Sequence, residues 1–220
     1  MARFVITATG TDVGKTVFAA GLCGMIGADY WKPVQSGLAG NVPNEAAAPA
    51  DGRAAQPGSD RAEVERLSGA RTHPEAWMLR DPLSPHRAAE LQGVVVDPGT
   101  LTLPAGDRLV IEGAGGVLVP LTRQVLYADL FARWQIPVVL VASTGLGTIS
   151  HSLTALESLR ARGVPVHGVA FVGARNDDNM ATIGQIGRVR VLGRLPILPD
   201  LGRTALAQAM TANFSAEDFA

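Results

Sequence analysis

The sequence predicts an α/β protein, in which residues 1–220 form a single domain with a doubly wound, mainly parallel sheet and helices on both faces. Apolar strand-like runs alternate with helix-like segments along the chain, and this order favours parallel strands joined by crossover helices. Some runs, such as 136–143, are apolar throughout, as expected of strands that are covered on both faces. A chain of 220 residues, of which 47% are hydrophobic, is long enough to bury one sizeable core.

The overall charge and the cysteine content limit the classes of partner. The formal net charge is −1, so no strong electrostatic field favours nucleic acid or an anionic membrane. The only cysteine, Cys23, lies in an apolar segment, where we expect it to pack in the core. The chain starts with a strand-like run rather than a signal segment, and no apolar run approaches the length of a membrane span. We therefore expect a cytoplasmic protein without nucleic-acid or membrane partners.

A phosphate-binding loop is predicted between the first strand and the first helix. Residues 4–6 are apolar and β-prone, Gly14-Lys15-Thr16 follows a polar loop, and residues 17–26 are typical of a buried helix. Backbone N–H groups at a helix start favour an anion, and Gly14 lets the backbone approach it closely. Lys15 would contact the β- and γ-phosphates, and the Thr16 hydroxyl would bind Mg²⁺. This arrangement makes the predicted fold that of a P-loop NTPase.

The spacing of this loop departs from the general pattern, which has a glycine five positions before Gly14. Thr9 stands at that position, and Gly10 follows one residue later. The alternative is an ordinary strand-to-helix turn that contains Gly-Lys-Thr by chance. The strand before the loop, the helix after it and its place near the start of the chain all favour the phosphate loop.

The second predicted strand, within residues 28–33, ends at Lys32-Pro33 because proline cannot continue a parallel strand. Lys32 then lies at the carboxyl end of a strand, where open α/β sheets bind ligands. The alternative for Lys32 is a solvated surface charge. Residues 35–37 are expected in a loop, and 37–58 is predicted to be a long loop that is either mobile or a lid.

Two further helices are predicted from their first residues. Ser59 or Asp60 would cap a helix that runs to Ser68, and the alternative for Asp60 is a metal ligand. Pro85 suits the first turn of the next helix. His86 is expected to hydrogen-bond locally, and a catalytic role is the alternative.

A glycine-rich stretch follows a buried strand at 109–111. We expect Glu112 to cap this strand and, beside a phosphate loop, to hold the Mg²⁺ shell. Gly113, Gly115 and Gly116 would let the backbone come close to a ligand.

The rest of the chain continues the alternation of strand and helix. A helix is predicted to run to about Arg162, and its start, near residues 147–150, is a second potential anion site. The other predicted elements are strands at 136–143, 164–172 and 190–197, a polar turn at 176–179 and a last helix at 201–210.

Several of these segments together resemble the dethiobiotin synthetase family, and the resemblance covers nearly the whole chain. Its most specific part is Lys-Pro-Val-Gln-Ser-Gly at 32–37, which follows the phosphate loop. The segments that carry the resemblance are 11–17, 31–37, 58–60, 83–86, 110–116 and 145–149.

Members of this family are ATP-dependent ligases of biotin biosynthesis, which form the ureido ring of dethiobiotin from 7,8-diaminononanoate and CO₂ with Mg²⁺. The resemblance implies that one amine takes up CO₂ as a carbamate and that the carbamate attacks the γ-phosphate. The resulting carbamic–phosphoric anhydride would then be closed by the second amine. The resemblance also implies a homodimer that binds the substrate carboxylate across its interface.

The same resemblance assigns roles to individual residues. It implies Lys15 and Lys32 as catalytic residues, and Thr16, Asp60 and Glu112 as Mg²⁺ ligands. The residues implied to bind substrate are Ser36, Gly147, Thr148, Ile149 and Ser150. The residues implied to bind the nucleotide are Asp12, Val13, Gly14, Lys15, Thr16, Val17, Asp60, Glu112, Gly113, Ala114, Gly115, Val172, Gly173, Leu195, Pro196 and Ile197.

The sequence departs from the family at places that bear on the nucleotide. Ala8 and Gly10 stand where glycine and aspartate are usual, which leaves the bend of the loop's first half open. Val172-Gly173 stands where an asparagine usually contacts the base, although Asn176 is near in sequence. The preference between ATP and other nucleoside triphosphates is therefore open.

The alternative function is a nucleotide switch like the partition and septum-site ATPases, which share this fold. Those proteins usually carry an extra lysine early in the loop, near Thr9 or Gly10, and this lysine is absent here. The tail at 211–220 is short and acidic rather than basic or amphipathic. A third possibility is an ATP-dependent domain of cobalamin synthesis, although no fused glutaminase region is visible.

Overall fold

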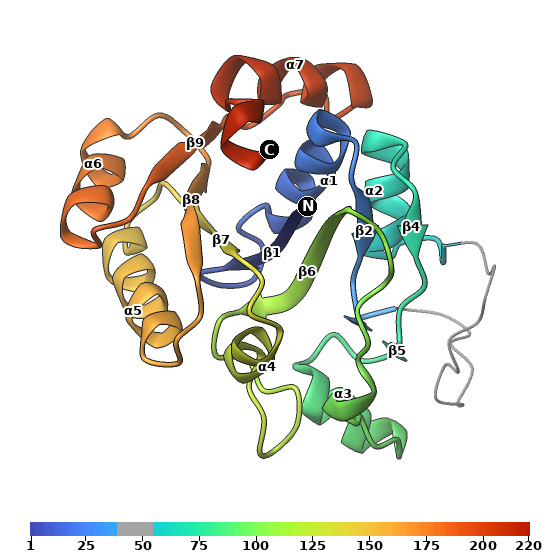
Figure 1. Ribbon diagram of the computed structural model, residues 1–220. Helices are drawn as coiled ribbons and strands as arrows, with labels where there is room; N and C mark the ends of the chain where they lie inside the picture. Colours follow the sequence, from blue (N-terminus) through green and yellow to red (C-terminus); the bar gives the residue numbers. More distant parts are fainter. Residues whose placement is uncertain (39–54) are drawn as a thin grey trace.

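Seven parallel strands form the central sheet of the computed structural model, which describes residues 1–38 and 55–220. Their order across the sheet is β4-β2-β6-β1-β7-β8-β9, with the phosphate-loop strand β1 in the middle (Figure 1). The strands are β1 (Ala2–Ala8), β2 (Asp29–Trp31), β4 (Thr72–His73), β6 (Arg108–Gly116), β7 (Val138–Ser143), β8 (Val166–Val172) and β9 (Val191–Leu195). The predicted doubly wound parallel sheet is confirmed.

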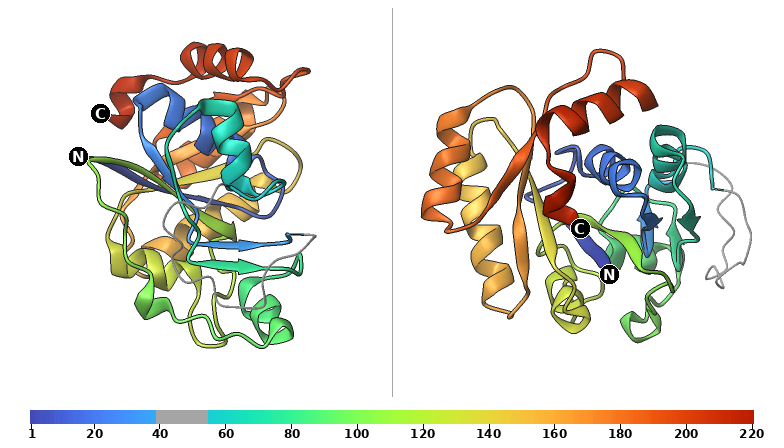
Figure 2. Two further views of the ribbon diagram at one scale, coloured as in Figure 1. Left: turned by 90° about the vertical axis from the view of Figure 1, so that its right-hand side faces the viewer. Right: turned by 45° about the horizontal axis from the view of Figure 1, so that its top comes forward.

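Helices cover both faces of this sheet (Figure 2). Alternate residues of a strand point to opposite faces, so Phe4 and Ile6 of β1 belong to one core and Val5 to the other. The first core contains α1 (Lys15–Ile26), α2 (Asp60–Ser68), α7 (Arg203–Asn213) and the short 3₁₀ turn η2 (Ala216–Phe219). The second contains α3 (Pro85–Gln92), α4 (Tyr127–Trp134), α5 (Thr148–Arg160) and α6 (Asp177–Ile186), and the 3₁₀ turn η1 (Pro98–Thr100) follows α3.

A small second sheet replaces the loop that was expected after Lys32. Strand β3 (Val34–Ser36) pairs in parallel with β5 (Trp77–Leu79), so the prediction of a loop at 35–37 is wrong. The backbone carbonyl of Pro33 accepts hydrogen bonds from the N–H groups of Ala76 and Trp77, at 2.9 and 3.1 Å. These bonds turn the chain out of the central sheet and into the second one. The local sequence does not predict this change, because the partners of Pro33 lie about 40 residues further along the chain.

Two helices on the second face differ from the sequence-based prediction. The polar residues 176–179 form no isolated turn, because Asn176 caps α6 and its side chain accepts from the Asn179 N–H at 3.1 Å. Helix α4 lies in a region for which no helix was predicted. Both helices are short, and α6 begins with a polar cap that resembles a turn when only its own residues are considered.

Strand β6 continues beyond Glu112, so the prediction that Glu112 caps it is wrong. Ile6 pairs with Glu112, and the next pair is Ala8 with Gly116, which leaves extra residues in β6 and a bulge. The glycines after Glu112 therefore belong to an irregular strand end that lies against the phosphate loop.

The long loop predicted at 37–58 falls largely on residues 39–54, which lie outside the described residues. Among residues 1–38 and 55–220, no helix has both the length and the apolar character needed to cross a membrane.

Candidate active site

The loop between β1 and α1 has the backbone of an anion site. Gly14 precedes the first helical residue with φ +87°, and a Cβ atom there would lie 2.7 Å from Val172 Cγ1. Only glycine fits this conformation and this contact. Asp12 also has a positive φ, 58°. Since no side chain caps α1, its first N–H groups are available to a phosphate.

A cleft of about 770 Å³ opens beside this loop, at the carboxyl edge of the sheet. It brings together the phosphate loop, Lys32 after β2, Ser36 of β3, the start of α2 and the end of β6. The lining residues are Thr11, Asp12, Gly14, Lys15, Thr16, Val17, Lys32, Gln35, Ser36, Gly37, Asp60, Pro82, Leu83, Ser84, Pro85, Ala114, Gly115 and Val119. Most residues predicted to contact the phosphates and the reacting groups thus share one cavity.

Four side chains meet at the floor of this cleft: Thr16, Lys32 and Asp60 line it, and Glu112 lies fully buried behind them. The Lys32 ammonium donates to Asp60 Oδ2 and, at 3.1 Å, to Glu112 Oε1. The Thr16 hydroxyl lies 3.1 Å from Asp60 Oδ1 and 2.9 Å from Glu112 Oε1. Lys15 Nζ lies 3.8 Å from Glu112 Oε1. We call Thr16, Lys32, Asp60 and Glu112 the floor cluster.

Ser59, rather than Asp60, caps helix α2. The Ser59 side chain accepts from the Ala62 N–H at 3.1 Å, and Ser59 is almost fully buried. The Asp60 carboxylate is therefore not needed for capping and faces Lys32 and Thr16 instead. Asp60 is also anchored through its backbone N–H, which donates to Gln35 Oε1 at 3.2 Å.

The two buried lysines of the cleft have opposite pKa shifts. Burial lowers the pKa of Lys15, and the nearby Glu112 carboxylate only partly offsets this effect. Burial also acts to lower the pKa of Lys32, but Glu112 and Asp60 together outweigh it, and the pKa is raised. Burial alone would raise the pKa of Asp60, but the Lys32 ammonium holds it below its usual range.

Tyr30 is a site neighbour that the sequence analysis missed. Its hydroxyl donates to Glu112 Oε2 at 2.9 Å, and both residues are fully buried. Burial, and then the negative charge of Glu112, raise the pKa of Tyr30 well above its usual value, so the phenol keeps its proton. The local sequence around Tyr30 is that of an ordinary buried strand, and only the strand order brings it next to Glu112.

The donor set of the floor cluster fits Mg²⁺. One hydroxyl and two carboxylates, from Thr16, Asp60 and Glu112, converge within hydrogen-bonding distance of one another or of Lys32. Magnesium prefers oxygen ligands, with one or two carboxylates and the rest supplied by phosphate and water. In residues 1–38 and 55–220, no three His, Cys, Asp or Glu side chains gather into a richer metal site.

Ser36 presents a free hydroxyl to the cleft. Its Oγ is buried and has no hydrogen-bond partner within the described residues. A buried polar atom without a partner is costly, so a bound ligand that hydrogen-bonds to it would be favoured.

The second predicted anion site lies apart from the cleft. Gly147, with φ +87°, precedes the first residue of α5, and Thr148 is buried and donates to the Ser143 carbonyl. Ile149 is half-buried and Ser150 is exposed. None of residues 147–150 is among the cleft-lining residues, so one chain does not bring the two anion sites together.

The residues predicted to border the base lie at the ends of β8 and β9. Gly173 donates to the Leu195 carbonyl at 3.0 Å, and its own carbonyl accepts from Arg194 at 2.8 Å. Pro196 is half-buried and Ile197 is exposed. Asn176, the nearest asparagine, caps α6 and donates to the Thr144 carbonyl at 3.3 Å, so both ends of its amide are engaged.

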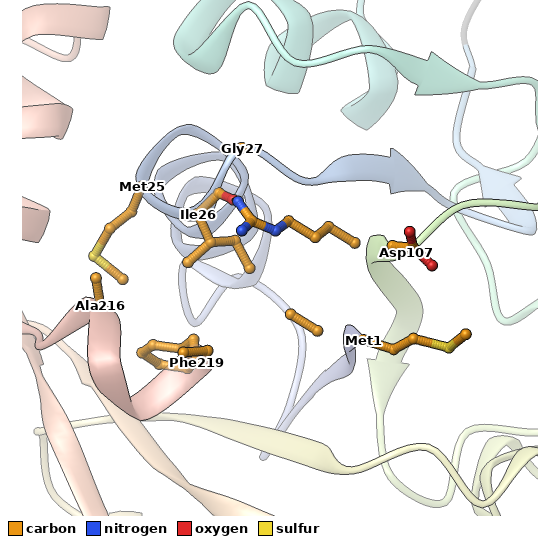
Figure 3. A pocket seen from close by; sticks show the side chains of 10 residues that line it. Met1, Met25, Ile26, Gly27, Asp107, Ala216 and Phe219 are labelled. Atoms are coloured by element: carbon orange, nitrogen blue, oxygen red, sulfur yellow. The ribbon is translucent and has the colours of Figure 1, made fainter.

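A second cavity of about 850 Å³ lies at the opposite, amino edge of the sheet (Figure 3). Both chain termini border it, together with Met25, Ile26, Gly27 and Asp107. It contains none of the predicted site residues, and the lysine and carboxylate cluster lies in the other cavity. The candidate active site is therefore the cleft at the carboxyl edge.

The fold and this site define the chain as a P-loop NTPase. Residues 2–205 match the family described as an AAA domain. The cell division ATPase MinD of Pyrococcus furiosus shares the fold, with a TM-score of 0.58, 13% identity and coverage of 96% of this chain and 99% of that chain.

Curated relatives show to which family of P-loop NTPases the chain belongs. A protein of Novosphingobium aromaticivorans named ATP-dependent dethiobiotin synthetase is 54% identical over the full length of both chains. A protein of Sphingopyxis alaskensis with the same name is 48% identical, also over the full length of both. The chain belongs to the ATP-dependent dethiobiotin synthetase family, as the sequence resemblance implied.

Proposed function

We propose that this chain closes the ureido ring of dethiobiotin by joining 7,8-diaminononanoate and CO₂, with conversion of ATP to ADP and phosphate. As a member of the dethiobiotin synthetase family, the chain is an ATP-dependent ligase of biotin biosynthesis. The observation that carries the finer proposal is the buried Lys32 ammonium, which lies between two carboxylates beside the phosphate loop.

The proposed reaction has three steps. One amine of the substrate adds to CO₂ and loses a proton, which gives a carbamate. A carbamate oxygen then attacks the γ-phosphorus, the bond to the bridging oxygen breaks, and ADP leaves. Finally the second amine attacks the carbonyl carbon of the carbamic–phosphoric anhydride, a C–N bond forms, the C–O bond to phosphate breaks, and the amine loses a proton.

In this reaction an anionic carbamate must approach a polyanionic nucleotide, and the two negative charges repel each other. The positive charges of Lys15 and Lys32 would reduce this repulsion. Lys15, the first residue of α1, would contact the β- and γ-phosphates, and Lys32 would contact the carbamate and the phosphoryl group in transfer. The N–H groups of residues 12–17 would hold the phosphates. Ser36, whose hydroxyl has no hydrogen-bond partner within the described residues, would donate to the substrate or the carbamate.

Thr16, Asp60 and Glu112 would hold the Mg²⁺ ion. When bound, this ion neutralises charge on the phosphates and on the groups that lie between them. Within the chain, Lys32 pairs with both carboxylates and Lys15 lies 3.8 Å from Glu112, and these two cations offset the charge of the two acidic side chains.

We propose that the active form is a homodimer. The substrate carboxylate would bind to residues 147–150 of a second copy, because these residues do not line the cleft of their own chain. Leu146, directly before this site, is a fully exposed large apolar side chain, which suits a position covered by another subunit. No side chain caps the start of α5 within the described residues, so its first turn would offer backbone N–H groups to a carboxylate.

The nucleotide base is proposed to lie between residues 172–173 and 195–197. Since Asn176 is engaged in capping α6, the base would meet backbone groups and the Val172 side chain rather than a free amide. We therefore expect weaker discrimination between ATP and other triphosphates than a side-chain amide would provide.

Phosphate release from MgATP, with and without 7,8-diaminononanoate and bicarbonate, tests this function. The proposal expects release that requires both substrates, together with a cyclic urea product identified by mass, and the assay is repeated with CTP and GTP. Slow release that is indifferent to the diamine would contradict the proposal and would instead fit a nucleotide switch.

The anhydride can be tested separately with ¹⁸O-labelled CO₂. If a carbamate oxygen attacks the γ-phosphorus, that labelled oxygen leaves with phosphate when the ring closes. Reactions quenched in the first turnovers, before CO₂ exchanges oxygen with water, should yield labelled phosphate. Unlabelled phosphate alongside labelled dethiobiotin would exclude the anhydride.

A further inference from the structure

We propose that Tyr30 is a positioning residue for Glu112: its buried phenol holds one carboxylate oxygen so that the other faces the reacting phosphates and the metal. This inference rests on the proposed Mg²⁺-dependent function, and it assigns a role to a residue outside the floor cluster.

The strand register explains how Tyr30 reaches Glu112. Tyr30 of β2 pairs with Val110 of β6, and both belong to the core on the α1 face. Glu112 lies two residues further along β6, so its side chain points to the same face. A tyrosine ring is long enough to span this diagonal, and its hydroxyl arrives 2.9 Å from Glu112 Oε2.

The two oxygens of Glu112 have separate partners. Oε1 accepts from Thr16 at 2.9 Å and from Lys32 at 3.1 Å, and it lies 3.8 Å from Lys15 Nζ. In the described residues, Oε2 has the Tyr30 hydroxyl as its hydrogen-bond donor. Oε1 of Glu112 is therefore directed toward the residues of the cleft, and Oε2 is directed into the core.

Loss of the Tyr30 hydroxyl would leave Oε2 buried beside an apolar ring. The terminal torsion of a glutamate is soft, so the carboxylate would turn to bring this oxygen toward the Lys32 ammonium. Glu112 would then no longer present a fixed oxygen next to Thr16. Hydrogen bonds of this kind typically change metal affinity by about 10–100-fold when they are removed from a ligand.

Tyr30→Phe separates this role from simple packing, because it keeps the ring in the core and removes only the hydroxyl. The matched control is Tyr127→Phe, since Tyr127 is also fully buried but its hydroxyl has no hydrogen-bond partner within the described residues. ATP affinity would be measured calorimetrically in EDTA and at increasing Mg²⁺ for wild type and both variants.

We expect Tyr30→Phe to raise the Mg²⁺ concentration needed for tight ATP binding by about 10–100-fold and to leave the affinity in EDTA near the wild-type value. Tyr127→Phe should leave the Mg²⁺ dependence unchanged. A wild-type Mg²⁺ dependence in Tyr30→Phe would overturn the inference. If wild type itself bound ATP without regard to Mg²⁺, the proposed metal site would fail instead, so the two failures can be told apart.

A second measurement retains Tyr30 and so does not depend on the folding of Tyr30→Phe. The chain has two tyrosines, so the Tyr127→Phe variant grown with 3-fluorotyrosine carries one fluorine reporter, at Tyr30. MgATP should shift its ¹⁹F resonance relative to ATP in EDTA, because the carboxylate bonded to the phenol would acquire a cation. An identical resonance in both states would contradict the inference.

Discussion

Lys15 and Lys32 are two buried cations in one cleft, but their surroundings differ. Lys32 has two carboxylate partners that keep its pKa above the ordinary value, whereas burial outweighs the nearby Glu112 carboxylate and lowers the pKa of Lys15. Lys32 thus donates to two carboxylates in the folded chain, while Lys15 Nζ lies 3.8 Å from Glu112 Oε1, which is longer than a hydrogen bond to an anion. A phosphate group at the start of α1 would supply that anion.

This difference gives a stability prediction for Lys15→Met. Because the pKa of Lys15 is lower in the folded chain than its ordinary value of 10.5, its proton is held less tightly there. The charged group therefore costs stability at neutral pH, and this cost falls as the pH rises from the lowered folded-state pKa toward the ordinary value, above which it is gone. Without nucleotide, Lys15→Met should have a Tm equal to wild type or higher by about 2–4 °C.

Scanning calorimetry with and without MgATP checks this prediction. The Tm increase that MgATP produces in wild type should be absent in Lys15→Met. A marked fall in Tm without nucleotide would show that Lys15 stabilises the fold, and the account of its burial would be wrong.

The residue scale also marks where sequence reasoning succeeded. Gly14, Lys15, Thr16 and Lys32 line one cleft, as expected of segments that follow parallel strands whose carboxyl ends meet at one edge, and their roles stay predictions. Tyr30 was missed because its role depends on the order of strands β2 and β6, which lie far apart in the sequence.

At the scale of elements, helix α2 packs against the sheet and also positions Asp60, a candidate Mg²⁺ ligand. Ser59 caps the helix from a buried position, and this fixes the first turn in which Asp60 lies. The sequence offered Ser59 and Asp60 as equal candidates for the cap. Only the structure distinguishes them, because Asp60 has partners on α1 and after β2.

Ser59→Ala should lower the free energy of unfolding by about 1 kcal/mol through loss of the cap. For a chain of this size that corresponds to a Tm decrease of about 2–4 °C. It should also weaken the Mg²⁺ dependence of ATP binding, because Asp60 loses its fixed position.

Ser158→Ala is the matched control, since Ser158 lies inside α5, where its hydroxyl donates to the Thr154 carbonyl at 2.7 Å. This change should leave both properties nearly unchanged. Equal effects of the two substitutions would remove the special role given to Ser59.

Helices α4 and α6 were not predicted from the local sequence pattern. In α6 the polar residues at its start act as cap and first turn, and their carbonyl partner, Thr144, comes from the loop after β7. The strand at 109–111 was recognised, but its continuation to Gly116 depends on pairing with β1. Local sequence predicts a segment's preference, whereas its bounds here are decided by partners.

For the whole molecule, the parallel sheet places its carboxyl strand ends on one edge, and the cleft is lined there from the ends of β1, β2 and β6. One part of the proposed site, residues 147–150, lies outside the cleft of its own chain. A dimer would complete the site, and this leads to a prediction for Leu146.

Leu146→Lys should shift the protein toward monomers in light scattering, and it should raise the KM for the diamine while leaving ATP affinity near wild type. Ile186→Lys is the control, because Ile186 is also exposed but lies at the carboxyl end of α6, near the amino edge of the sheet. Unchanged mass and KM in Leu146→Lys would contradict the proposed interface.

The central claim is that Lys32 serves the chemistry rather than the binding of nucleotide, and Lys32→Met tests it most directly. Methionine fills a similar volume, and Mg²⁺ is supplied throughout so that Asp60 and Glu112 are not left without a cation. ATP affinity and dethiobiotin formation are then measured on the same preparation. We predict an affinity near wild type and a loss of turnover of at least about 100-fold. Turnover at the wild-type rate would contradict the account.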